Sequence, residues 1–110
     1  MMTPECKEII VVGSSNLDMV VSSERIPQRG ETLLGSHFFT VPGGKGANQA
    51  VAAAKLGGRV TFVSKLGNDA HGDQLYSNFK ACGVKLNRIS RSDRSPTGIA
   101  MIIVDKEGNN

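Results

Sequence analysis

The sequence predicts an α/β protein with a mostly parallel sheet and a smaller accessory β-sheet. Residues 9–12 form a continuous β-branched run that ends at Gly13, which is typical of a strand buried on both faces in a parallel sheet. Helical and extended patterns then alternate along the chain, as in parallel α/β folds. An extended segment interrupts this alternation before the first helix, and it predicts the accessory flap.

The accessory segment is expected to form a hairpin. Residues 19–21 begin an extended piece, and Pro27-Gln28-Arg29-Gly30 has the composition of a turn that closes it. Residues 31–41 are again rich in strand-forming side chains. The two pieces can therefore pair, and Pro42 stops the second one.

Two helices are expected in the core. Residues 47–56 are good helix formers, and Gly57-Gly58 follows them as a helix stop. The alanines of this segment allow the helix to lie close against a sheet. Residues 60–63 predict the next strand. Residues 73–82 then carry apolar side chains at helical spacing.

The last part of the chain predicts two more strands. Residues 86–92 suit a short exposed strand, and residues 97–105 suit a strong one. A turn pattern at 106–110 then predicts a returning strand, but the sequence ends there. We therefore expect the chain to be the front part of a longer fold.

The composition is that of an ordinary globular domain. The 110 residues suit one small domain or a piece of a larger one, with 39% hydrophobic and 21% charged side chains. Thirteen basic and ten acidic residues give a net charge of +3, which is too mild to indicate nucleic acid. The basic residues between 85 and 94 recur without interleaved aromatic side chains, so a solvated face is expected there.

Cysteines and apolar runs indicate a soluble intracellular protein. Cys6 and Cys82 show neither a CxxC pattern nor metal-ligand spacing, so free thiols in a reducing compartment are expected. The longest apolar runs, at 9–12 and 99–104, are far too short to span a bilayer. The N-terminus is acidic and lacks the basic and apolar regions of a signal peptide.

Two polar side chains come directly after the first expected strand. Asn16 and Asp18 would lie at its C-terminal end, where open α/β sheets bind their ligands. If the chain stays extended, their spacing of two places both side chains on one face. Either residue could instead satisfy a local turn.

The most distinctive stretch is the glycine-rich loop before the first helix, Gly43-Gly44-Lys45-Gly46-Ala47-Asn48-Gln49. Glycine lets a backbone approach a ligand closely, and the N–H groups of the following helix point into that space. The loop matches neither the G-x-x-x-x-G-K-[ST] phosphate motif nor the G-x-G-x-x-G dinucleotide motif, whose third glycine would stand at Gln49. Neither ATP nor NAD binding is therefore indicated by this loop.

A sugar fits the polar side chains better than a nucleotide does. Neighbouring hydroxyls both donate and accept, so carboxylates, amides and ammonium groups hold them. Asn16, Asp18, Lys45 and Asn48 make such a set if the loop folds back over the end of the first strand. Asn48 could instead cap the helix, and Lys45 could be a solvated surface charge.

No catalytic constellation accompanies this set. His37 and His71 lie in separate segments without a partner pattern, and we expect surface or packing roles for them. Neither a Ser/His/Asp arrangement nor paired carboxylates stand out. The sequence offers no general base for chemistry on a sugar and no metal site.

Four motifs, in order, carry a resemblance to a known family. They are Val12-Gly13-Ser14-Ser15-Asn16-Leu17-Asp18, Pro27-Gln28-Arg29-Gly30-Glu31-Thr32, the stretch 43–57, and Gly67-Asn68-Asp69-x-x-Gly72, with Thr97-Gly98 as a weaker fifth. Together they resemble the ribokinase-like (PfkB) carbohydrate kinase family. The similarity covers nearly the whole chain after residue 7, and Lys45 points to the ribose-phosphorylating branch.

The resemblance implies a three-layer α/β fold with a β-sheet lid, whose strands would lie within about 17–41 and 97–110. It implies transfer of the γ-phosphoryl group of ATP to the 5-hydroxyl of ribose, with Mg²⁺ and a monovalent cation such as K⁺. The lid would cover the sugar and mediate a homodimer, in the cytoplasm or also in the nucleus. The implied sugar-binding residues are Asn16, Leu17, Asp18, Gly44, Lys45, Gly46, Ala47 and Asn48.

Length is where the chain departs from this family. Family members are much longer, and their C-terminal part would carry the catalytic aspartate, the ATP pocket and the cation sites. We therefore expect residues 1–110 to be an incomplete kinase domain that is inactive alone. Three alternatives remain open: a non-catalytic fragment that pairs with a full-length kinase through its lid strands, a free-standing sugar-binding module, and a kinase for another pentose or carbohydrate.

Overall fold

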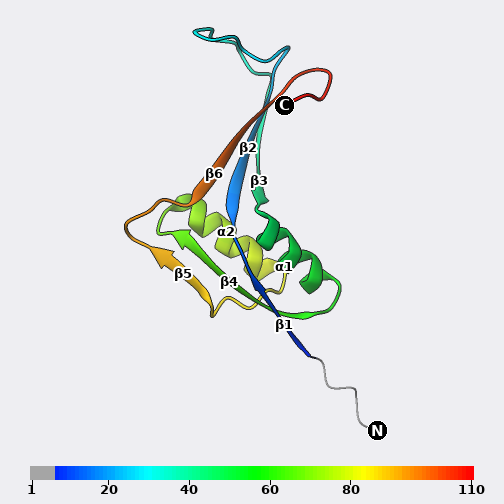
Figure 1. Ribbon diagram of the computed structural model, residues 1–110, viewed down its shortest axis with the longest axis vertical. Coiled ribbons are helices and arrows are strands. Elements are labelled where there is room, and N and C mark those ends of the chain that lie inside the picture. The colour runs from blue at the N-terminus through cyan, green and yellow to red at the C-terminus, as the bar shows by residue number, and fades with distance from the viewer. Residues whose placement is uncertain (1–6) are drawn as a thin grey trace.

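The computed structural model describes residues 7–110, so the expectations for Cys6 and for the N-terminal segment lie outside the described residues. This part of the chain forms two three-stranded sheets and two helices (Figure 1). The first sheet has the strand order β1-β4-β5 and is entirely parallel. Its strands are β1 (Glu8–Val12), β4 (Arg59–Gly67) and β5 (Ile89–Ser92). The predicted α/β architecture with a parallel sheet is therefore confirmed.

The two helices build the core against the central strand of this sheet. They are α1 (Lys45–Lys55) and α2 (Ala70–Ala81), and each begins slightly earlier than the sequence pattern predicts. Val60 and Phe62 alternate along β4 and are fully buried beneath the helices. Phe62 meets Phe79 of α2 edge to face, with the ring centroids 5.4 Å apart. Ala50 is fully buried as well, so the alanine-rich helix does lie close to the sheet.

The expectation that residues 9–12 are buried on both faces is wrong for this chain. Ile10 is 65% exposed and Val12 is 75% exposed. Both helices cover the face of the sheet to which Val11 contributes, while Ile10 and Val12 alternate onto the opposite face. No helix of residues 7–110 covers that second face, and β1 pairs on one side only, with β4.

The second sheet stands out from the core and has the strand order β3-β2-β6 (Figure 1). Its strands are β2 (Asn16–Ser22), β3 (His37–Gly43) and β6 (Gly98–Val104). β2 and β3 pair antiparallel, so the predicted hairpin is confirmed. β6 pairs parallel with β2, from Asn16 opposite Gly98 to Ser22 opposite Val104. The last predicted strand thus belongs to the accessory sheet.

The loop between β2 and β3 is held by a charged pair. Both terminal nitrogens of Arg25 contact the carboxylate of Glu31, at 2.6 and 2.7 Å. The backbone N–H of Gln28 donates to the same carboxylate at 3.0 Å. The Arg25 guanidinium and then this N–H hold the pKa of Glu31 at about 2. Glu31 of the second motif therefore stabilises the loop between β2 and β3.

Neither helix of the described chain could cross a membrane, because they have 11 and 12 residues.

Candidate functional site

The two sheets meet where β1 continues into β2. Three residues, Gly13 to Ser15, connect the strands, and the glycine-rich loop before α1 lies against them. A Cβ added to Gly46 would lie 2.7 Å from the Cα of Gly13, which no side chain tolerates. Gly44 has a φ of 104° and faces the carbonyl oxygen of Ser14, so it combines a left-handed backbone with a close approach. The loop therefore folds back over the end of the first strand.

Asn16 and Asp18 lie on one face of β2, as their spacing predicts. The Asn16 amide donates a hydrogen bond to Asp18 Oδ1 at 2.6 Å. Gly43 of β3 leaves space for this pair, because a Cβ there would lie only 2.6 Å from Asp18 Oδ1. Leu17 points to the opposite face and is fully buried in the core, so only its backbone is available to a ligand.

Two polar side chains at the start of α1 remain available. Lys45 and Asn48 are both exposed, and neither side chain hydrogen-bonds to another group within residues 7–110. Asn48 also lines a groove of about 350 Å³ between α1 and α2. Both residues lie in the first turn of α1, directly after the Gly43-Gly44 step that contacts Asp18 and Ser14, and neither forms a direct hydrogen bond with Asn16 or Asp18.

The first N–H groups of α1 are only partly available. The N–H of Ala47 donates to the carbonyl oxygen of Ser14 at 3.2 Å, and the N–H of Asn48 donates to that of Gly44 at 2.9 Å. Gly46 and Ala47 are themselves buried. The N–H groups of Ala47 and Asn48 are therefore already bonded and are not free to bind a ligand.

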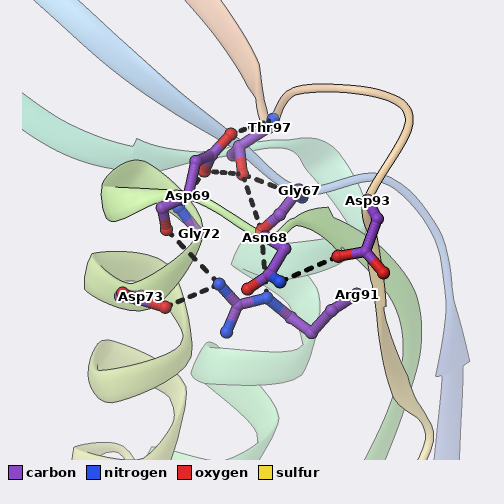
Figure 2. A network of polar contacts seen from close by, with 8 residues as sticks. All are labelled: Gly67, Asn68, Asp69, Gly72, Asp73, Arg91, Asp93 and Thr97. Carbon is purple, nitrogen blue, oxygen red and sulfur yellow. Dashed lines mark hydrogen bonds and ion pairs between the residues drawn. The ribbon is translucent and has the colours of Figure 1, made fainter.

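A second polar cluster lies where β4 passes into α2 (Figure 2). Asp69 is the N-cap of α2, and its carboxylate accepts from the N–H of Gly72 at 2.8 Å. It also accepts from Thr97, both from the hydroxyl at 2.6 Å and from the N–H at 2.9 Å. Thr97 in turn accepts from the N–H of Gly67 at 2.9 Å and is 4% exposed. The cluster joins the end of β4, the start of α2 and the start of β6.

Hydrogen bonds stabilise the charged form of the Asp69 carboxylate in this cluster. The hydroxyl of Thr97, followed by the N–H groups of Thr97 and Gly72, holds the pKa of Asp69 at about 2. Arg91 of β5 supports the same turn, since it donates to the carbonyl oxygen of Gly67 at 2.9 Å and pairs with Asp73 at 2.6 Å.

Two of the family motifs, Gly67-Asn68-Asp69-x-x-Gly72 and Thr97-Gly98, meet in this cluster, and their sequences alone do not indicate the role of either. The local signal was the aspartate before a helical pattern, which indicates an N-cap. The contact with Thr97 spans 28 residues, so no local pattern reveals it.

The described residues do not fit a metal site. Within residues 7–110 no three histidine, cysteine or acidic side chains gather closely enough to hold an ion. Asn16, Asp18, Lys45 and Asn48 offer hydrogen-bond donors and acceptors for a polar organic ligand.

Comparison with known proteins decides the family. Residues 7–110 match the family described as "pfkB family carbohydrate kinase". The chain belongs to this family. Ribokinase of Bacillus subtilis is 47% identical over 104 residues, which are 94% of this chain and 35% of that protein. Ribokinase of Mus musculus is 42% identical over 106 residues, which are 96% of this chain and 33% of the mouse protein.

Solved structures in the pfkB family share the fold in detail. The structure of Arabidopsis thaliana ribokinase complexed with ribose and ATP superposes with a TM-score of 0.88 at 40% identity. The superposition covers 96% of this chain and 35% of the plant protein. The chain thus spans about a third of the length of the relatives that it matches, and the resemblance read from the four motifs is confirmed.

Proposed function

We propose that this chain supplies the ribose-binding part and the lid of a ribokinase, which phosphorylates D-ribose to D-ribose 5-phosphate with ATP. The observation that carries the proposal is the pair of Asn16 and Asp18, which share one face of β2 beside the glycine loop. A carboxylate and an amide there can accept and donate to neighbouring sugar hydroxyls. The similarity to a ribokinase complexed with ribose and ATP supports this choice of substrate.

In this proposal the sugar contacts come from two elements. β2 contributes Asn16, the backbone of Leu17 and Asp18. The start of α1 contributes Lys45 and Asn48 through their side chains. Its N-cap Gly44 and the helical residues Gly46 and Ala47 contribute by letting the backbone lie close to the ring. The second sheet acts as the lid. β6 lies within residues 97–110, whereas β2 begins one residue before the range 17–41 and β3 ends two residues after it.

ATP, Mg²⁺ and K⁺ would be held by residues outside this sequence. The glycine loop lacks both nucleotide motifs, and the described residues gather no metal ligands. Phosphoryl transfer depends on groups that position ATP and neutralise charge, so residues 1–110 alone are proposed to be inactive. The location is proposed to be the cytoplasm.

We also propose that the lid sheet pairs with the lid of a second copy. Five large apolar side chains of the sheet are exposed: Phe38 (67%), Phe39 (51%), Val41 (40%), Ile99 (48%) and Met101 (78%). Within the described chain, both outer strands of this sheet lack a further partner strand, and open edges favour pairing. A short isoform that joins a full-length kinase would use the same surface.

The test compares the 110-residue chain with the complete enzyme, expressed from the reading frame continued past Asn110. We expect the complete enzyme to consume ATP when D-ribose is added, whereas the chain alone does not. Asp18→Asn should remove most of this activity, and Arg25→Gln, which touches only the distal loop, is the matched control. Robust turnover by the chain alone, or a complete enzyme indifferent to ribose, would overturn the proposal.

A further inference from the structure

The polypeptide crosses between the core and the lid sheet three times. The first crossing is the connection from β1 to β2, and the second is the glycine step from β3 to α1. The third is the segment from β5 to β6, which ends at Thr97. Glycines line the first two crossings, at Gly13 and at Gly43-Gly44. Only the third is held by a side-chain carboxylate among the described residues.

The third crossing is fixed from several sides. Asp69 binds the N–H and the hydroxyl of Thr97, at 2.9 and 2.6 Å. The same carboxylate caps α2 through the N–H of Gly72, so Thr97 is tied to a helix that packs in the core. Gly67 and Gly72 lie so close to Thr97 that an added Cβ at either position would clash with its atoms. Figure 2 shows Thr97 bonded to both Asp69 and Gly67, beside the start of α2.

This attachment point is directly connected to the sugar residues. Thr97 immediately precedes Gly98, which stands opposite Asn16 in the parallel pairing of β6 and β2. Ala100, two residues later, stands opposite Asp18. Because β6 and β2 are paired in this register, the position at which β6 leaves the core is coupled to the position of the strand that carries Asn16 and Asp18.

We propose that Asp69 is a positioning residue of the sugar site, because its carboxylate fixes Thr97 as the pivot of the lid sheet. It acts on the sugar only through β6 and β2 and touches no substrate. This inference rests on the proposed function for its sugar-positioning part, whereas the pivot itself rests on the described contacts alone.

The pivot is tested on the 110-residue chain by amide hydrogen exchange. Asp69→Asn places an amide where N–H and hydroxyl donors converge, and it should speed exchange at Thr97 and along residues 98–100 by about tenfold or more. Asp73→Asn is the matched control. It removes a carboxylate one turn later on α2, which pairs with Arg91 and not with Thr97, and it should leave exchange along β6 within about twofold.

A second pair of variants separates the pivot from the helix cap. Thr97→Val removes the hydroxyl but leaves the bond from the Gly72 N–H to Asp69 intact. If Asp69→Asn does not fold, the exchange rates of Thr97→Val test whether the contact between Asp69 and Thr97 fixes β6. Thr97→Ser keeps the hydroxyl and should restore slow exchange. If Asp69→Asn and Thr97→Val both exchange like Asp73→Asn, the pivot is refuted.

The positioning role is tested on the complete enzyme by steady-state kinetics. Asp69→Asn and Thr97→Val should raise the KM for ribose by about tenfold, with the KM for ATP and kcat at saturating ribose changed by no more than about twofold. Thr97→Ser should recover the wild-type KM. Faster exchange with an unchanged ribose KM would overturn the positioning role. If the wild-type complete enzyme ignores ribose, the proposed function fails, and the exchange data still decide the pivot.

Discussion

Gly43→Ala is the most direct test of the proposed sugar site at Asn16 and Asp18, because the position of the added methyl group follows from the structure. An ideal Cβ on Gly43 lies 2.6 Å from Oδ1 and 2.7 Å from Oδ2 of Asp18. Gly43 is not among the glycines with positive φ, so alanine fits its backbone. The flexible carboxylate must therefore turn away from its place beside Asn16.

The expected cost appears in binding, and stability should change little. A hydrogen bond to a charged group contributes about 1.5–3 kcal/mol, and a loss of that size raises a dissociation constant by about 10–100-fold. We expect Gly43→Ala to weaken ribose binding to the complete enzyme by this factor in isothermal titration calorimetry. The urea midpoint of the complete enzyme should shift only slightly, because the carboxylate can rotate.

Gly98→Ala is the matched control for this experiment. Gly98 flanks Asn16 from the other neighbouring strand, in the same register as Gly43. A Cβ at Gly98 would lie 3.4 Å from the Cβ of Asn16, close to ordinary contact, so ribose affinity should fall by less than about threefold. Equal effects of the two alanines would refute the argument that the space beside Asp18 is what the glycine preserves.

Three further outcomes are expected. Phe79→Ala deletes a fully buried ring and should lower the free energy of unfolding by about 3–5 kcal/mol in urea titrations, whereas Leu56→Ala, at an 89% exposed side chain, should change it little. Lys45→Ala should raise the KM for ribose without changing the urea midpoint, since its side chain has no hydrogen-bond partner within residues 7–110. Asp69 and Glu31 have folded pKa values of about 2 against usual values of 3.8 and 4.5, so the stability they contribute is complete above about pH 4.5 and disappears as pH falls toward 2. Acid titration of Asp69→Asn, followed by circular dichroism, should show a flatter loss than wild type, and an unchanged curve would contradict the assignment.

Much of the fold follows from short-range patterns. The alanine-rich helix, the strand around Phe62 and the hairpin of β2 and β3 could all be predicted, because each depends on neighbouring residues. The family resemblance places residues 97–110 in the lid, but no local pattern predicts that β6 pairs with β2, since the two segments lie about eighty residues apart. Burial of β1 was mispredicted for a related reason: a β-branched run indicates a strand but does not say which faces other elements cover.

The site shows the same division between local and long-range information. A spacing of two places Asn16 and Asp18 together, and the same alternation places Leu17 on the opposite face. The sequence therefore contained the reason to exclude the Leu17 side chain from the sugar contacts. The position of Asp18 relative to Gly43 depends on strand register, which the hairpin sequence alone leaves open.

The proposed sugar-binding side chains are divided between the accessory sheet and the core, and this division is why the attachment of the lid at Thr97 matters. Asn16 and Asp18 belong to β2, whereas Lys45 and Asn48 belong to a helix of the core. A ligand held by both groups fits only when the two sheets meet at the correct angle. Residues that touch no sugar can then control its binding by fixing where the lid strands leave the core. Substitutions at such residues should therefore act on the KM for ribose through geometry, as those at the sugar contacts act through lost hydrogen bonds.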